Sequence, residues 1–69
     1  MELKDALDVF RRRVGKKVVA YEERSNGFIF ITDTSSGPYD THFYQITPNE
    51  IIVTNPILCK LDKDKIKKL

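Results

Sequence analysis

The apolar residues at the start of the chain follow the period of an α-helix. They recur at spacings of three and four, so that one side of a helix carries Leu3, Ala6, Leu7, Phe10 and Val14. Acidic residues precede basic ones on the other sides, as the helix dipole favours. Gly15 follows the last apolar position and supplies the left-handed conformation that ends a helix. The pattern therefore predicts an amphipathic helix over residues 2–14.

The segment after the helix changes to the hydrophobic period of β-strands. Residues 18–21 and 28–32 are rich in β-branched and aromatic side chains, and an Asn26-Gly27 pair lies between them. Asn-Gly favours a type I′ turn, because both central residues of that turn need a positive φ. A turn at this pair places Ser25 opposite Phe28. We therefore predict an antiparallel hairpin with that register.

Both faces of the predicted hairpin are apolar. One face carries Val19, Tyr21, Phe28 and Phe30, and the other carries Val18, Ala20, Ile29 and Ile31. A single helix covers one face of a small antiparallel sheet, and the bare face is usually polar. We therefore expect the N-terminal helix to cover one face and a C-terminal segment or a second subunit to cover the other.

The rest of the chain alternates between turns and short strands. Residues 33–40 (DTSSGPYD) have the composition of a loop, and residues 41–46 predict a third strand. Residues 47–50 predict a tight turn with proline at its second position. Residues 51–54 predict a fourth strand, which ends there because Pro56 restricts the residue before it.

The C-terminal tail allows three interpretations. It forms a strand with Ile57, Cys59 and Leu61 on one face, or a helix from residue 56 whose apolar stripe is interrupted by Lys65. In the third interpretation, Asp62 caps a short helix and Leu61 packs on Ile66 as a hydrophobic staple. We favour the third.

Length and composition agree with a single domain over residues 1–69. A chain of 69 residues buries only about 60% of the surface that it exposes when unfolded, so its core is small. The element order predicts an α+β fold: an N-terminal helix packed on a four-stranded, mainly antiparallel meander, with a short C-terminal strand or helix. The net charge of +2 is far from the excess typical of strongly basic nucleic-acid binders.

Cysteine content and hydropathy bear on location and cofactors. Cys59 is the only cysteine, so no internal disulfide forms, which favours a reducing cytoplasm. The first fifteen residues lack the apolar core of a secretory signal, and no apolar run is long enough to cross a bilayer. We expect a cytoplasmic protein without a membrane partner. One His and one Cys are too few for a metal cluster, so we expect no metal and no cofactor.

Positive charge is concentrated towards the two ends of the chain. Residues 1–24 hold seven Lys or Arg, residues 57–69 hold five, and residues 25–56 hold none. A candidate nucleic-acid patch therefore consists of Arg11, Arg12, Arg13, Lys16, Lys17, Lys63, Lys65, Lys67 and Lys68. The three arginines point in different directions on a helix, and cations also stabilise a helix C-terminus. Nucleic-acid binding is therefore the alternative function.

Polar residues around the 33–42 loop raise the question of catalysis. They are Asp33, Ser35, Ser36, Asp40 and His42. Such groups are catalytic only when a fold fixes them within hydrogen-bond reach of one another, and a loop on a chain of this size offers little cleft. We expect turn chemistry here, and we do not expect an enzyme.

The aromatic residues of the strands favour a core or a subunit interface. Sheets that stack nucleic-acid bases mix basic residues with the aromatic ones, and residues 28–44 contain no basic residue. The candidate interface comprises Val19, Tyr21, Phe28, Phe30 and Phe43. We predict a non-enzymatic protein-interaction module that forms a homodimer through a face of its sheet.

Overall fold

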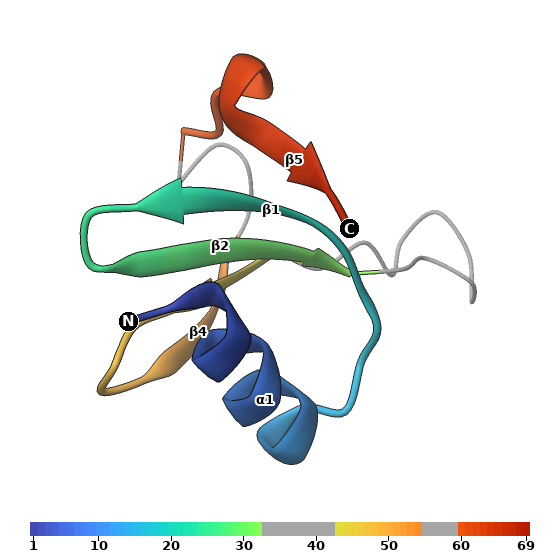
Figure 1. Ribbon diagram of the computed structural model, residues 1–69, viewed down its shortest axis with the longest axis vertical. Helices are drawn as coiled ribbons and strands as arrows, with labels where there is room; N and C mark the ends of the chain where they lie inside the picture. The colour runs from blue at the N-terminus through green and yellow to red at the C-terminus, as the bar shows by residue number, and fades with distance from the viewer. Residues whose placement is uncertain (33–42, 55–59) are drawn as a thin grey trace.

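One α-helix lies against one face of a five-stranded antiparallel sheet in the described part of the chain (Figure 1). The structure is a computed structural model that describes residues 1–32, 43–54 and 60–69. Its elements are α1 (Leu3–Arg13), β1 (Val18–Arg24), β2 (Gly27–Thr32), β3 (Phe43–Ile46), β4 (Ile51–Thr54), the 3₁₀ turn η1 (Lys63–Lys65) and β5 (Ile66–Lys68). The strand order is β4-β3-β2-β1-β5. The predicted α+β fold is confirmed.

Helix α1 forms as the apolar spacing predicts. Ala6 and Phe10 are buried against the sheet, and the charged residues of the helix are exposed. A glycine stop follows: Gly15 has a φ of +77°, a conformation that other residues adopt rarely. The N–H groups of Val14 and Gly15 both donate to the carbonyl oxygen of Phe10, at 2.8 and 3.3 Å. The predicted boundaries of 2–14 are confirmed to within one residue at each end.

The core lies between α1 and the sheet face that carries Phe30. The Phe10 ring packs edge-on against the rings of Phe30 and Tyr44, with centroids 5.3 and 5.0 Å away. This is a geometry that the charge distribution of aromatic rings favours. Phe28 and Ile46 are buried beside them. Phe10 therefore fills the centre of the contact between helix and sheet.

The β1–β2 hairpin turns at Ser25 and Asn26, one residue earlier than predicted. Glu23, and not Ser25, pairs with Phe28, so the predicted register is wrong. Neither turn residue has a positive φ, and the turn is therefore not of type I′. The error moves one strand by two residues against the other. Because two is an even number, the side chains between the turn and the bulge described below keep their predicted faces.

Gly27 lies in the strand because β2 begins against the backbone of β3. A Cβ atom on Gly27 would lie 1.9 Å from the carbonyl oxygen of Ile46, and the φ of Gly27 is +156°. No residue with a side chain fits there without moving one of the two strands. Because of this contact with β3, Gly27 belongs to β2 and not to the turn that the Asn26-Gly27 pair favours.

We expect Gly27→Ala to lower the free energy of unfolding by about 3 kcal/mol, because β2 and β3 must separate to admit the methyl group. Gly15→Ala is the matched control. Its Cβ atom would lie 3.9 Å from the nearest atom, so mainly the φ cost of about 1 kcal/mol applies. Urea unfolding followed by circular dichroism measures both variants. A loss for Gly27→Ala no larger than that for Gly15→Ala would contradict this explanation of the turn.

A bulge at the start of β1 changes the face of the sheet on which Val18 lies. The register shifts between Val18 and Ala20, and Val18 packs against the core under α1. The prediction that Val18 lies on the face opposite Tyr21 is therefore wrong. The extra residue of a bulge reverses the alternation of side chains on one side of it.

The second half of the chain largely follows the prediction. The turn at residues 47–50 is closed by a hydrogen bond of 2.9 Å from the Thr47 N–H to the Glu50 carbonyl, and β4 covers the predicted 51–54. The third strand is confirmed over Phe43–Ile46; its predicted first two residues and the 33–40 loop lie outside the described residues.

The cap of the third interpretation of the tail is confirmed, whereas the strand interpreted over Ile57, Cys59 and Leu61 lies mostly outside the described residues. The Asp62 carboxylate accepts a hydrogen bond of 3.0 Å from the Asp64 N–H and so caps η1. The chain then continues as β5, which pairs antiparallel with β1. Figure 1 shows β5 at one edge of the sheet, with β4 on the other side of the β1–β2 hairpin.

The face of the sheet away from α1 is covered unevenly. One cross-strand row on it runs from Glu22 through Ile29 and Gln45 to Ile52. Glu22 and Ile29 are buried, whereas Gln45 and Ile52 are exposed. The backbone N–H of Asp62 donates to Glu22, which places the C-terminal segment against the buried end of the row. This face of the sheet is therefore buried near β1 and β2 and exposed near β3 and β4.

Candidate functional site

The outer edge of β4 is an exposed apolar edge of the sheet. β4 ends the strand order, and no strand within the described residues pairs with its outer side. Val53 and Ile52 leave 60% and 43% of their surface exposed, on opposite faces of the strand. Apolar residues on both faces are typical of interior strands and not of strands at an edge.

The other edge of the sheet carries charge. Lys67 and Lys68 of β5 are exposed, and lysine on an edge strand opposes pairing with another chain. β4 consists of Ile51, Ile52, Val53 and Thr54, all of which have high β-propensity and no charge. The edge at β5 therefore carries charge that opposes pairing, and the edge at β4 has no such charge.

The candidate interface residues do not form one surface. Phe28 and Phe30 are buried under α1, and Tyr21 is half-buried with its ring against Phe28. Phe43 pairs with Ile31, on the face away from α1. Val19 accepts a backbone hydrogen bond from Leu69 beyond the end of β5. The aromatic set serves mainly as the core, and the interface predicted on it has no common surface.

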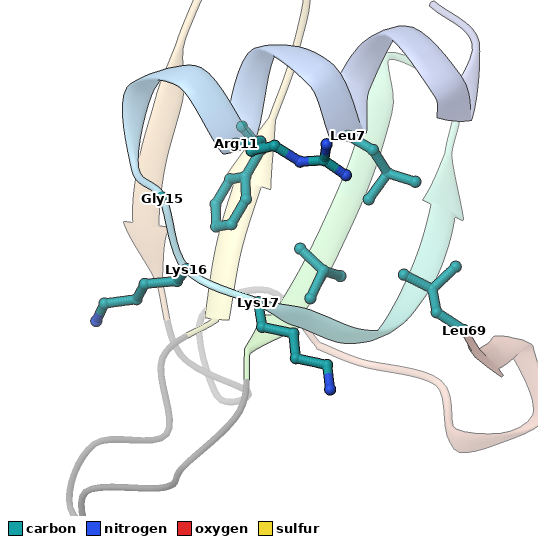
Figure 2. A pocket seen from close by; sticks show the side chains of 8 residues that line it. Leu7, Arg11, Gly15, Lys16, Lys17 and Leu69 are labelled. Carbon is teal, nitrogen blue, oxygen red and sulfur yellow. The ribbon is translucent and has the colours of Figure 1, made fainter.

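A basic cleft of about 340 Å³ lies between the C-terminal end of α1, the start of β1 and the end of β5. Its lining combines apolar and cationic residues without a carboxylate side chain: Leu7, Phe10, Arg11, Gly15, Lys16, Lys17, Val18 and Leu69. Figure 2 shows the Arg11 side chain extending from the helix towards Leu7, with Lys17 on the opposite side of the cleft. Lys16 extends away from them, and its ammonium lies 5.7 Å from the centre of the Tyr44 ring.

The structure does not bring the nine cations of the candidate nucleic-acid patch together. Three of them, Arg11, Lys16 and Lys17, line the basic cleft. Arg12 is paired with Asp8 at 3.2 Å on the exposed side of α1, in the i, i+4 order that the sequence suggests. Lys65 and Lys67 line a different hollow together with Glu23 and Asp64. Arg13, Lys63 and Lys68 are exposed. Nucleic-acid binding stays a prediction.

A buried ion pair, which sequence analysis missed, joins β1 to the C-terminal segment. Glu22 is 3% exposed, and its Oε1 lies 2.8 Å from Nε of Arg24, although that N–H is not aligned for a hydrogen bond. Its Oε2 accepts the N–H of Asp62 at 3.1 Å, and the Arg24 guanidinium donates to the Lys60 carbonyl at 3.4 Å. The signal in the sequence is Glu22-Glu23-Arg24, a charged run within a strand whose partner is apolar. We call this group the Glu22 clasp.

The polar residues around the 33–42 loop, for which turn chemistry and not catalysis is expected, lie outside the described residues. Within residues 1–32, 43–54 and 60–69, no three His, Cys, Asp or Glu side chains are grouped so that they could hold a metal ion. No helix within the same ranges is long and apolar enough to span a bilayer. The described part of the chain thus offers two candidate sites, the β4 edge and the basic cleft.

Comparison with known proteins adds no relative. No family model matches the sequence, and no curated protein and no solved structure matches it at the significance required. Function is therefore argued from the geometry of the chain itself.

Proposed function

We propose that this protein is a small non-enzymatic interaction module that assembles through the open edge of β4, and that the partner at this edge is a second copy of the chain. The observation that carries the proposal is the pair of exposed apolar residues, Ile52 and Val53. They lie on opposite faces of an edge strand whose outer side pairs with no strand among the described residues. A reducing cytoplasm remains the expected location, because Cys59 is the only cysteine.

The backbone of β4 has its free hydrogen-bonding groups at two residues. The Thr47–Glu50 bond closes the β3–β4 hairpin, and hydrogen-bonded pairs then alternate along the ladder. Ile52 and Thr54 accordingly bond inward to β3, while Ile51 and Val53 direct their N–H and C=O groups outward. A partner strand must satisfy these four groups.

A second copy of β4 satisfies them by symmetry. A two-fold axis perpendicular to the sheet, through Ile52, places Ile52 opposite its own copy and Ile51 opposite Val53 of the second copy. The outward groups then meet as two hydrogen-bonded pairs, which makes four hydrogen bonds. The axis keeps both α1 helices on the same side of a continuous ten-stranded sheet.

Charge also favours a second copy at this edge. β4 has no charged residue, so its self-pairing brings no like charges together. Pairing of β4 with β5 of another molecule would bury the exposed Lys67 and Lys68 against an apolar strand and would extend into an open fibre. The closed dimer avoids both.

We expect the chain to be dimeric at micromolar concentrations and Val53→Lys to be monomeric, because a lysine at the edge has to be buried in the dimer. Leu69→Lys is the control, since Leu69 has a similar exposure of 58% but lies at the other edge of the sheet. Sedimentation equilibrium over a range of concentrations measures the mass of all three chains. A monomeric parent chain, or a Val53→Lys chain that stays dimeric, would disprove the proposal.

The register gives a sharper test in a Cys59→Ser background. In the proposed dimer the two copies of residue 52 form a non-hydrogen-bonded pair with Cα atoms about 4.5 Å apart, within the range of a disulfide. Ile52→Cys should therefore cross-link on mild oxidation. Ile51→Cys faces residue 53 of the other copy and should not. Equal cross-linking of the two variants would reject this register.

A further inference from the structure

The basic cleft is a feature that assembly through β4 leaves unexplained. It lies at the far side of the sheet from β4, and none of its lining residues belongs to β3 or β4. We propose that this cleft binds a small phosphomonoester that carries an apolar group. The proposal is independent of the β4 edge.

Two cations of the cleft are not engaged in ion pairs within the described residues. Neither Arg11 nor Lys17 forms an ion pair with a residue in ranges 1–32, 43–54 or 60–69, and no carboxylate side chain lines the cleft. Arg11 belongs to α1 and Lys17 to the segment between α1 and β1. Both line the hollow, and in Figure 2 the end of the Lys17 side chain points away from Arg11. Positive charge confined to a hollow attracts an anion more strongly than the same charge spread over a convex surface.

Stabilisation of the helix end explains only part of this arrangement. Cations in the last turn interact favourably with the C-terminal end of a helix, and Arg12 and Arg13 occupy that turn together with Arg11. Lys17 lies beyond the glycine stop at Gly15, outside the range in which the helix dipole acts. It therefore adds to the cleft a cation that stabilisation of the helix end does not account for.

The apolar lining determines the rest of the ligand. Leu7 and Val18 are only half-buried, and Leu69 is largely exposed, so the cleft presents apolar surface beside the two cations. A volume of about 340 Å³ is at the lower end of the range for small-molecule sites, so the part of the ligand held in the cleft is small. An alkyl or aryl group on this surface gains free energy by leaving water.

A phosphate group matches the cationic side better than a carboxylate. A phosphomonoester carries about 1.5 to 2 negative charges at neutral pH, which is close to the combined charge of Arg11 and Lys17. The guanidinium also binds phosphate oxygens through two parallel hydrogen bonds. A carboxylate carries one charge and leaves one cation unmatched.

Titrations of ¹⁵N-labelled protein followed by NMR test the site with hexyl phosphate, inorganic phosphate and hexanoate. We expect hexyl phosphate to bind at least about tenfold more tightly than either of the others, with shifts centred on Leu7, Arg11 and Leu69. Arg11→Gln should weaken its binding about tenfold. Arg12→Gln is the matched control, because Arg12 adjoins Arg11 in sequence and is paired with Asp8 outside the cleft. It should leave binding unchanged.

A variant at Leu69 separates the two halves of the ligand. Leu69→Ser should weaken the binding of hexyl phosphate and leave that of inorganic phosphate unchanged. Vesicles of phosphatidylcholine with and without phosphatidic acid then distinguish a lipid headgroup from a soluble phosphomonoester. Selective binding to either source supports the site.

Three results would overturn the proposal. The first is the absence of shifts in the cleft with both hexyl phosphate and phosphatidic acid. The second is an equal loss of affinity in Arg11→Gln and Arg12→Gln, which would show attraction by the surface as a whole. The third is tighter binding of a short oligonucleotide than of hexyl phosphate, lost in both variants, which would favour the nucleic-acid patch instead.

Discussion

Phe10→Ala is expected to lower the free energy of unfolding by about 3–5 kcal/mol. Domains of this length have a total stability of about 3–10 kcal/mol, so the variant loses a large part of it. The Phe10 ring is almost fully buried and packs edge-on against Phe30 and Tyr44. No other side chain of α1 reaches the centre of this aromatic group, and its removal leaves a cavity.

Urea unfolding followed by circular dichroism measures this loss, with Phe10→Leu as the control. Leucine keeps most of the buried volume and loses the ring contacts, so we expect it to cost about 1–2 kcal/mol. Near-ultraviolet dichroism of the aromatic side chains, Tyr44 among them, reports whether the remaining core is ordered. A Phe10→Ala chain with the midpoint of the parent chain would show that α1 is not held through this residue.

The helix could be predicted because the residues that determine it lie close together in the sequence. The apolar spacing from Leu3 to Val14 leaves one arrangement that buries all of these residues, and Gly15 marks the end. The 47–50 turn and β4 are local in the same sense. These elements agree with the prediction to within one or two residues.

The prediction of the β1–β2 turn was wrong because a tertiary contact overrides the local preference of the Asn26-Gly27 pair. Asn26-Gly27 favours a type I′ turn in isolation. In the folded chain the backbone of Ile46 lies where a side chain on residue 27 would project. The glycine is therefore used for close packing between strands, which no window of sequence around the turn reveals.

The fifth strand and the basic cleft depend on pairing between distant segments. Ile66–Lys68 is too short and too charged to predict a strand by itself, and its partner β1 lies more than forty residues earlier. The cleft combines Arg11, Lys17 and Leu69, three residues that the sequence does not relate. The candidate interface residues lie on different surfaces for a related reason. An apolar strand pattern does not say which face the helix covers or which strand lies at the edge.

The uneven distribution of positive charge along the sequence leads to an uneven distribution across the sheet. Residues 25–56, which hold no Lys or Arg, supply β2, β3 and β4. The cation-rich ends supply α1, β1 and β5. Because β4 and β5 are the opposite edges of the sheet, one edge is uncharged and the other is basic. This polarity supports strand addition at β4 and anion binding near β5 as separate properties.

Arg24→Met is expected to cost about 3 kcal/mol of stability, because it leaves the buried carboxylate of Glu22 without its counter-charge. This is the low end of the range for breaking a buried ion pair, since the Arg24 side chain is one-third exposed. The substitution also removes the hydrogen bond to the Lys60 carbonyl. Both effects weaken the Glu22 clasp and hence the attachment of β5 to β1.

Arg12→Met is the matched control, because it removes the same group from the exposed pair with Asp8 and should cost no more than about 0.5 kcal/mol. Urea unfolding gives the two losses, and amide hydrogen exchange at Ile66–Lys68 shows whether β5 loosens in Arg24→Met alone. Adding Glu22→Gln to Arg24→Met should recover part of the stability, since no buried charge then remains unpaired. Equal losses for Arg24→Met and Arg12→Met, with unchanged exchange in β5, would show that the clasp does not hold the C-terminal strand.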